Sequence, residues 1–465
     1  MSGRGPRPAV RRAAAAGALA SLTLLATEQA AGAHGISSRG DLPISKGLFI
    51  YAAAFAVAIS FVAMPLFWAR PALARVAHGR RWRAADVPAL VGTVVLRVLG
   101  LALFALVFAA AWWGTDNSAE NIAPRWVYVV FWVFTQGLVV VLGDWWRALD
   151  PWDTLAMLGA RRLSPTPVPR PGDGSLVWSH WPAALGLLGF AWLELCYHAP
   201  DETRVVALAV TGYTVVVLAG AAVWGRAWLR TGNGFTVLFG LLAHLSPFFR
   251  DEAGKVRVRW PFSGLAAITP RRGTTAVVLV VLGGTTFDGV SRTRWWSDVL
   301  DSSRGWGRTG RNTLGLLAVV AAVAAVYVVA TRLVARLDGT DPATAPGRYA
   351  HSLVPIAFAY SVAHYFSLVF FEGQNALRQL SDPLGRGWNL FGTADRVVDY
   401  TSLSTGTIAW VQTGAIVIGH VVAVAVSHDR ALESGGPRTA MRSQVPLIVA
   451  MVGYTVMGLV LLLNA

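Results

Sequence analysis

Ten apolar blocks with almost no charge run along the chain, most of them about 18–24 residues long. A helix needs about 20 apolar residues to cross the hydrocarbon core of a bilayer, so these blocks predict membrane-spanning helices. The pattern predicts an all-α, polytopic transmembrane helix bundle of about ten spans. We place the spans at 48–68, 91–113, 126–143, 178–198, 205–224, 274–288, 313–331, 350–371, 404–427 and 445–464.

One further apolar segment, 233–249, is too short to span, with about 15 apolar residues. Pro247 ends it, and four basic residues follow between positions 250 and 259. A short apolar helix beside basic residues is typical of the membrane surface on the cytoplasmic side. The segment is predicted to be either a re-entrant or an interfacial helix.

The composition supports a membrane protein and excludes a soluble one. Hydrophobic residues make up 54% of the chain and charged residues only 14%, whereas a soluble domain carries about 25% charged residues. The net charge of +15 does not predict a nucleic-acid partner, because the arginines sit in short loops between apolar blocks, where they orient helices. The predicted partner is the lipid bilayer.

The amino terminus has the pattern of a secretory signal peptide at residues 1–33. Four arginines between positions 4 and 12 precede a short apolar stretch at 13–26, and Ala31-Gly32-Ala33 provides small residues before a cleavage site. Cleavage would leave one integral membrane domain, 34–465, that begins with His34 outside the cytoplasm. The alternative is an uncleaved anchor.

The distribution of basic residues predicts the orientation. With His34 outside, the cytoplasmic loops hold 23 Lys and Arg residues and the outer segments 12, in agreement with the positive-inside rule. This predicts a multi-pass protein of the cell membrane whose mature amino and carboxyl termini are both extracytoplasmic. Outer loop 289–312 is an exception with five arginines, and Arg97 lies inside the second span.

The segment Gly-Asp-Trp-Trp-Arg-Ala-Leu-Asp-Pro-Trp at 143–152 combines acidic, basic and aromatic residues on the predicted cytoplasmic side. The i,i+3 spacing of Asp144 and Arg147 favours an ion pair that packs the loop, which is a structural role. Tryptophans near span ends predict an aromatic belt at the membrane surface. They are Trp112, Trp113, Trp126, Trp145, Trp146, Trp152, Trp178 and Trp181.

Ionisable residues at membrane depth are costly and usually face the bundle interior. Glu194, His198, Asp288 and His364 lie at similar depth in the outer part of three spans. We expect these four side chains to converge in one cavity near the outer surface, with His34 close enough to join them.

Each member of this group has a functional and a structural interpretation. Glu194 and His198 are four residues apart and would share a helix face, as a metal-orienting pair, a proton path, or a hydrogen-bonded helix end. His364 shares a helix face with Tyr360, and is either functional or a core histidine. Asp288 is a ligand or proton-path candidate, or a carboxylate at a helix end facing water.

Imidazoles suit copper or zinc, so His34, His198 and His364 are the candidate metal ligands and Glu194 and Asp288 the candidate catalytic residues. The chain has no phosphate-binding GxxxxGK[ST], HExxH, GxSxG or CxxC motif. Nucleotide hydrolysis, zincin proteolysis and α/β-hydrolase chemistry therefore have no support in the sequence. Cys196 is the only cysteine, so no intrachain disulfide forms.

Several stretches of the sequence carry a resemblance, among them 143–152, 285–289 and 351–367. They run along nearly the whole mature chain and resemble a family of polytopic bacterial membrane proteins labelled fenitrothion hydrolase or fenitrothion hydrolase-like. The resemblance implies hydrolysis of an organophosphate triester. Separately, Ala-His-Gly at 33–35 resembles the start of copper proteins such as lytic monooxygenases, in which an amino-terminal histidine binds copper. The stretches similar to the family lie at 33–35, 41–44, 143–152, 190–195, 285–289, 351–367, 381–385, 390–393 and 428–431.

Three functions remain open at this point. The chain is a membrane hydrolase with a metal site near the outer face, a transporter or copper-handling protein that uses the same outer cluster, or a structural bundle. The first two imply a small hydrophobic substrate or a metal ion as partner. Intramembrane His, Glu and Asp residues are compatible with either.

Overall fold

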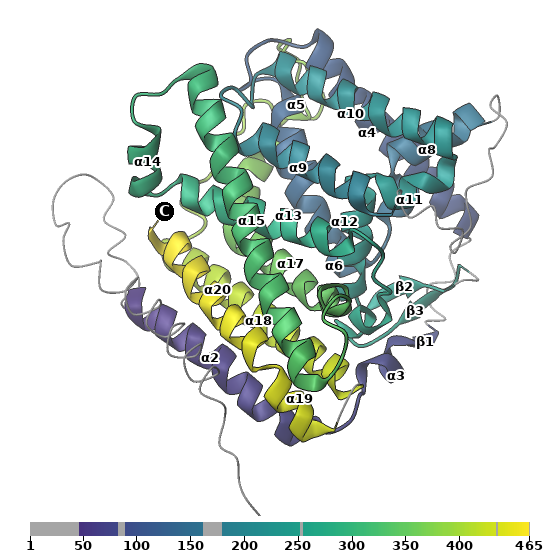
Figure 1. Cartoon of the computed structure of the whole chain (residues 1–465). Helices are drawn as coiled ribbons and strands as arrows, with labels where there is room; N and C mark the ends of the chain where they lie inside the picture. The colour runs from purple at the N-terminus through teal and green to yellow at the C-terminus, as the bar shows by residue number, and fades with distance from the viewer. Residues whose placement is uncertain (1–45, 82–88, 161–178, 252–253, 434–435, 465) are drawn as a thin grey trace, which may run out of the picture.

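The computed structural model describes residues 46–81, 89–160, 179–251, 254–433 and 436–464 (Figure 1). The longer helices are α2 (Lys46–Phe67), α4 (Ala89–Trp113), α6 (Thr135–Leu142), α8 (Pro151–Ala160), α9 (Trp181–Leu195), α10 (Thr203–Trp224), α12 (Gly234–Leu242), α13 (Thr274–Ser291), α15 (Gly305–Asp338), α17 (Ala350–Gln379), α18 (Thr405–Leu432) and α20 (Val445–Asn464). The short helices are α3 (Leu73–Ala77), α5 (Ile122–Arg125), α7 (Trp146–Leu149), α11 (Leu229–Gly232), α14 (Arg294–Leu300), α16 (Ala345–Arg348) and α19 (Pro437–Ser443).

Three 3₁₀ turns, a π-helix and a small sheet complete the described part of the fold. The 3₁₀ turns are η5 (Arg226–Trp228), η6 (Ala243–Leu245) and η7 (Ser263–Ala267), and the π-helix η3 (Trp126–Phe134) joins α5 to α6. The strands β1 (Arg80–Arg81), β2 (Phe248–Arg250) and β3 (Val256–Val258) form an antiparallel sheet in the order β1-β3-β2. Its register pairs Val258 with Arg80 on one side and with Phe248 on the other.

The predicted all-α, multi-pass membrane architecture is confirmed. Within the described ranges, eight helices are long and apolar enough to cross a membrane, and they match eight of the ten predicted spans. The other two predicted spans, 48–68 and 178–198, form α2 and α9. Their apolar stretches, Ile50–Met64 and Trp181–Leu195, are shorter.

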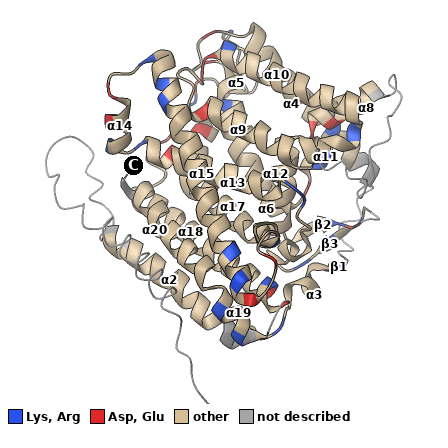
Figure 2. Cartoon of the chain, viewed as in Figure 1, with Lys and Arg blue, Asp and Glu red and all other residues tan. Residues whose placement is uncertain are grey.

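The bundle has two ends that differ in their loops (Figure 1). The sheet, α3, α7 and α19 lie at one end, called the sheet end below, and α14 lies at the other, called the α14 end. Gly143, after α6, meets Phe248 at the sheet end, and Gly114, after α4, meets Leu384 at the α14 end. Charged residues gather at these two ends, and the middle of the long helices carries few of them (Figure 2).

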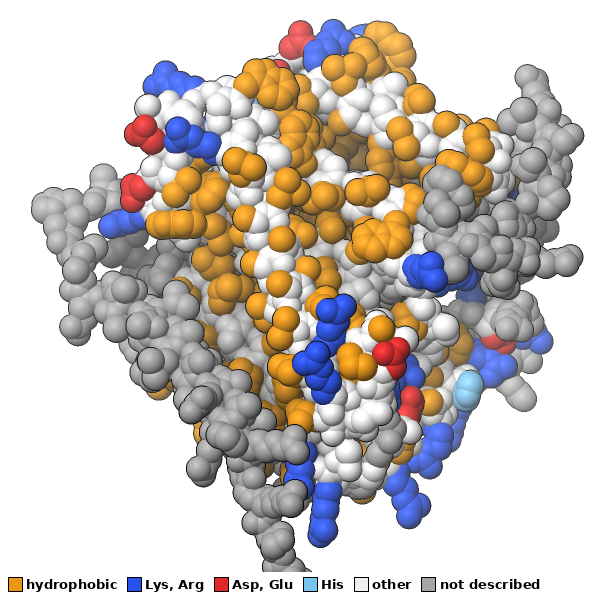
Figure 3. Space-filling view, viewed as in Figure 1, with side chains coloured by type: hydrophobic (Ala, Val, Ile, Leu, Met, Phe, Trp, Pro, Cys, Tyr) orange, Lys and Arg blue, Asp and Glu red, His pale blue; other side chains and the backbone are white. Residues whose placement is uncertain are grey.

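The outer surface of the bundle is apolar along the long helices. Leu314 on α15 and Val216 on α10 are 71% and 66% exposed. Figure 3 shows hydrophobic side chains along most of the visible length of α15. An apolar surface of this extent is costly in water and is suited to contact with lipid chains.

Helix α13 lies at the centre of the bundle, with 78% of its apolar stretch buried. It packs against α9, α15, α17 and α20. Gly283 has no room for a side chain, because a Cβ there would lie 2.7 Å from the Cα atom of Val320 on α15. Small residues allow this close approach of two helices. Asp288 follows one turn later on the same helix.

Most of the segment 233–249 is buried in the protein. Phe235, Leu238 and Phe239 of α12 are all nearly fully buried. The side chain of Asn233 caps the start of α12, and the guanidinium of Arg259 donates hydrogen bonds to backbone carbonyls at its end. Thr236, Gly240 and His244 lie on one face of the segment and are partly exposed. Both the re-entrant and the interfacial alternatives are compatible with this burial.

The predicted aromatic belt is correct only in part. Trp113 and Trp181 are more than half exposed, as a belt requires. Trp146 and Trp152 are buried in the core instead, where their indole N–H groups donate to Thr236 and Thr214. Their loop folds back into the bundle, which the position of these residues at a span end does not reveal.

Candidate functional site

An acid–base pair joins two central helices inside the bundle. Nε2 of His364 on α17 lies 2.5 Å from Oδ2 of Asp288 on α13, and the two side chains are 10% and 8% exposed. Arg292, one turn after Asp288, approaches the same carboxylate at 3.2 Å. The sequence predicts that Asp288 and His364 converge, and the structure brings them into direct contact.

Glu194 lies next to this pair. The hydroxyl of Tyr365, the residue after His364, donates a hydrogen bond to Glu194 on α9, and Glu194 is close enough to Asp288 for their charges to interact. On α17, His364 therefore contacts Asp288, and the next residue, Tyr365, contacts Glu194. With Arg292, the cluster contains two carboxylates, one imidazole and one guanidinium.

Two small cavities reach the cluster. One, lined by Thr286, Tyr360 and His364, has a volume of about 20 Å³, which is enough for a water molecule. The other, about 10 Å³ in volume, is lined by Glu194, Trp132 and Tyr365. Thr285 lines both cavities, so the two lie on either side of one threonine.

His198 does not pair with Glu194 as the i,i+4 spacing predicts. Helix α9 ends at Leu195, so His198 lies beyond the helix and the shared helix face does not form. Pro200 follows and has no backbone N–H to continue a helix. Nδ1 of His198 instead lies 3.1 Å from the hydroxyl of Thr309 on α15.

The predicted metal site is incomplete in the described part of the chain. His34 and the predicted signal peptide 1–33 lie outside the described residues. Among the residues that the structure does describe, no three His, Cys, Asp or Glu side chains are grouped as a metal ion requires. Cys196 is buried and free, as expected.

Two residues that contact the cluster, Arg292 beside Asp288 and Tyr365 beside Glu194, were not predicted from the sequence. Arg292 has a local signal, since it stands four residues after Asp288, the spacing of an ion pair on a helix. Tyr365 has no such signal, because its partner Glu194 comes from a distant helix. Only the folded arrangement, in which α9 and α17 both pack on α13, identifies it.

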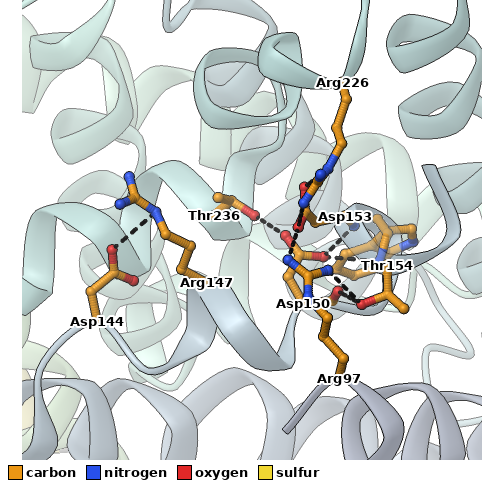
Figure 4. A network of polar contacts seen from close by, with 9 residues as sticks. Arg97, Asp144, Arg147, Asp150, Asp153, Thr154, Arg226 and Thr236 are labelled. Carbon is orange, nitrogen blue, oxygen red and sulfur yellow. Dashed lines mark hydrogen bonds and ion pairs between the residues drawn. The ribbon is translucent and has the colours of Figure 1, made fainter. Parts of the chain in front are cut away.

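A second polar network lies around the segment 143–152 and the start of α8, and joins them to α4, η5 and α12 (Figure 4). Arg226 and Arg97 approach Asp153 from opposite sides, at 2.6 and 2.8 Å. Burial acts to raise the pKa of Asp153, but the hydrogen bonds and charges of the two arginines outweigh it and hold that pKa below its ordinary value. The predicted pair Asp144–Arg147 is also present, at 3.7 Å and largely exposed.

Asp150 holds the start of α8 and is almost completely buried. Its Oδ1 atom accepts the backbone N–H groups of Trp152 and Asp153, and its Oδ2 atom accepts the hydroxyl of Thr236 at 2.6 Å. Together with the pairs around it, this carboxylate fixes the loop and α12. The structural interpretation of the segment 143–152 is therefore favoured.

The burial of Asp150 predicts a pH dependence of stability. Burial raises the pKa of its carboxyl from 3.8 to about 6. Between about pH 4 and 6 the folded protein therefore keeps a proton that the unfolded chain has lost, so this group's contribution to stability falls as the pH rises through that window, by up to about 3 kcal/mol.

The Asp150→Asn variant tests this effect, because its amide mimics the protonated carboxyl at every pH. We expect the stability of the variant relative to the native protein to increase from pH 4 to 7, measured by thermal unfolding in detergent with near-UV circular dichroism. A difference that stays constant over that range would show that Asp150 does not titrate there.

The outer cluster can bind a proton or a small polar ligand at membrane depth, whereas the network around the segment 143–152 has only structural roles. An imidazole in contact with a carboxylate beside a water-sized cavity is suited to proton transfer. Comparison with known proteins gives no match to a family model, to a curated protein or to a solved structure.

Proposed function

We propose that this chain is a membrane transporter that carries protons across the membrane by way of the Asp288–His364 pair. The observation that carries the proposal is the contact between these two side chains inside the bundle, at 2.5 Å and almost out of reach of solvent. Ionisable residues placed at this depth commonly mark proton and ion pathways.

The size of the adjacent cavity supports proton transfer. At about 20 Å³ it accommodates a water molecule but no larger organic molecule in this conformation. Glu194 and Arg292 add a second carboxyl group and a guanidinium beside the pair. A proton that arrives through this cavity would meet His364, which lines it, and then the Asp288 carboxylate in contact with His364.

The proposed location is the cell membrane, with the sheet end in the cytoplasm and both mature termini outside. The excess of basic residues in the loops of the sheet end supports this orientation. In this orientation the Asp288–His364 pair lies toward the extracytoplasmic side.

Proton flux across proteoliposomes tests the proposal. The purified full chain is reconstituted in vesicles that contain a pH-sensitive dye, and a pH gradient is imposed. We expect the native protein to dissipate the gradient faster than empty vesicles, and Asp288→Asn to lower this rate about 10- to 100-fold, the range for loss of an acid–base group.

Asp144→Asn is the matched control. Asp144 also pairs with an arginine, but at the exposed sheet end, so this variant should retain the native rate. Equal rates for the native protein and Asp288→Asn would contradict the proposal.

A second candidate function is hydrolysis of an organophosphate triester. The same acid–base pair beside a cavity for one water molecule favours it, since this arrangement can activate water as a nucleophile. The resemblance to fenitrothion hydrolase-like proteins is a further reason. Release of nitrophenolate from a nitrophenyl phosphotriester by the purified protein, lost in His364→Gln, would support hydrolysis over transport.

Metal binding by His34, His198 and His364 belongs to this second proposal and to a copper-handling role. Copper or zinc would polarise the phosphoryl oxygen or lower the pKa of a bound water. Metal analysis of the purified, signal-cleaved protein tests it directly. A metal-free protein that still hydrolyses the triester would exclude the metal-dependent form.

A further inference from the structure

A chain of buried polar side chains leads from the His364 cavity toward the middle of the bundle. Thr286 and Tyr360, which line that cavity, both contact Tyr454 on α20. The hydroxyls of Thr286 and Tyr454 are 2.6 Å apart, and the hydroxyl of Tyr360 donates to the backbone carbonyl of Tyr454 at 2.7 Å. The ring of His420 on α18 lies next to both tyrosines, 6.2 and 6.4 Å between ring centres.

His420 has one ring nitrogen next to a backbone carbonyl and one without a hydrogen-bond partner among the described residues. The side chain is fully buried, and its Nδ1 atom lies 2.8 Å from the backbone carbonyl of Ile416. A carbonyl only accepts, so Nδ1 carries the hydrogen and Nε2 keeps its lone pair. Nε2 has no hydrogen-bond partner among the described residues. A buried acceptor without a partner is unfavourable. His351 and His428 also have such a ring nitrogen, but His420 lies against Tyr360, which lines the His364 cavity.

The groups that face His420 are neutral. Tyr360 faces it from α17 and Tyr454 from α20, and α2, which also packs on α18, has Tyr51 as its one titratable residue within Ile50–Met64. No charged side chain of the described residues acts on His420. A proton bound at Nε2 would therefore meet no repelling charge. It would also have no counter-charge, so the imidazolium would need water as its partner.

The polar chain ends at His420. Toward the sheet end the same helices present an apolar layer of buried side chains, among them Val424, Met451 and Leu447. The next histidine in that direction on α17, His351, is nine residues from Tyr360, about 13 Å along the helix axis. In this conformation the polar chain thus opens toward the α14 end only.

We infer that Nε2 of His420 is an inner proton-binding position, reached from the His364 cavity through water beside Thr286, Tyr454 and Tyr360. The inference rests on the proposed function and specifies the route that the proton takes. In the binding step a protonated water donates its proton to Nε2. One O–H bond breaks, one N–H bond forms, and a neutral water and an imidazolium result.

The packing of Gly458 offers a second way to alter the route. A side chain at this position would overlap the hydroxyl of Tyr360. Gly458→Ala should therefore displace that hydroxyl from Tyr454 and from the neighbourhood of His420. This change leaves every ionisable group of the route in place.

Proton flux in the same proteoliposomes tests the inference with His420→Phe, which keeps an aromatic ring but removes the acceptor. We expect a loss of about 10-fold or more for His420→Phe and a smaller loss for Gly458→Ala. His244→Phe is the control, because His244 is partly buried and likewise lies beside a carbonyl four residues earlier, but far from the His364 cavity at the sheet end. It should retain the native rate.

The outcomes separate the inference from the proposed function. If Asp288→Asn has the native rate, the proposed function fails. If Asp288→Asn is impaired but His420→Phe transports like the native protein, only the inner proton position is contradicted.

If His420→Phe misfolds, nitrogen NMR of the native protein provides a second test. The protein is labelled with nitrogen-15 in its nine histidines. We expect the His420 signal, assigned by its loss in His420→Gln, to show a hydrogen on Nδ1 and contact between Nε2 and water. A hydrogen on Nε2 of the neutral ring, or an Nε2 without water contact, would contradict it.

Discussion

Replacing Asp153 with alanine is expected to destabilise the protein by about 3–5 kcal/mol, the range for a buried charge that loses its partner. Asp153 is the acidic partner of Arg97, which stands inside a membrane-spanning stretch of α4 with its side chain only 16% exposed. Without Asp153, the guanidinium of Arg97 keeps only its hydrogen bond to Thr154. Arg226 is 37% exposed and can turn toward water.

Thermal unfolding in detergent micelles measures this loss against two comparisons. Asp144→Ala removes an exposed ion pair and should change the stability by less than about 1 kcal/mol. The double variant Asp153→Leu/Arg97→Leu removes both buried charges and should recover most of the stability. If Asp153→Ala costs no more than Asp144→Ala, Arg97 does not depend on this partner.

Replacing Gly100 with alanine is expected to destabilise the protein by about 1–3 kcal/mol, because a methyl group has no room there. A Cβ at position 100 would overlap the backbone carbonyl oxygen of Leu149, in the last turn of α7. Backbone atoms cannot rotate away as a side chain does. Either α7 must move from α4, or Asp150, the residue after Leu149, must shift from its partners.

Gly92→Ala is the matched control on the same helix. No atom lies within 4 Å of a Cβ at position 92. Alanine is a better helix former than glycine, so this variant should gain up to about 1 kcal/mol. Equal effects of the two substitutions on unfolding would show that α4 and α7 are not in close contact.

The positions of the membrane-spanning helices follow closely from the sequence because the lipid imposes one rule on every span. A span must be apolar over a fixed length, and this local property can be read along the chain. The rule is weaker for α9, where the apolar block continues to position 198 but the helix ends at Leu195. Hydropathy does not register the proline at position 200 that follows.

The outer cluster could be predicted in outline but not in its contacts. Asp288, His364 and Glu194 share a depth because depth follows from position in a span, and the structure brings these three together. Which side chains touch depends on how α9, α13 and α17 rotate about their axes. His198 shows this limit, since a shift of three residues in a helix end changed its partner to Thr309.

The partner of Arg97 also could not be predicted from the sequence. Its position inside a span marks it as unusual, but Asp153 is 56 residues away in the chain. The network around Asp153 depends on the loop 143–152 folding back against α4, α10 and α12. Such long-range packing leaves no local pattern.

A double-mutant cycle on proton flux tests most directly whether Asp288 and His364 act as one centre. The rate is measured in proteoliposomes for the native protein, Asp288→Asn, His364→Gln and the double variant. Residues that act as a unit are not additive, so we expect each single variant to lose about 10- to 100-fold and the double variant to lose no more than the stronger single one. Losses that multiply in the double variant would contradict a shared acid–base centre.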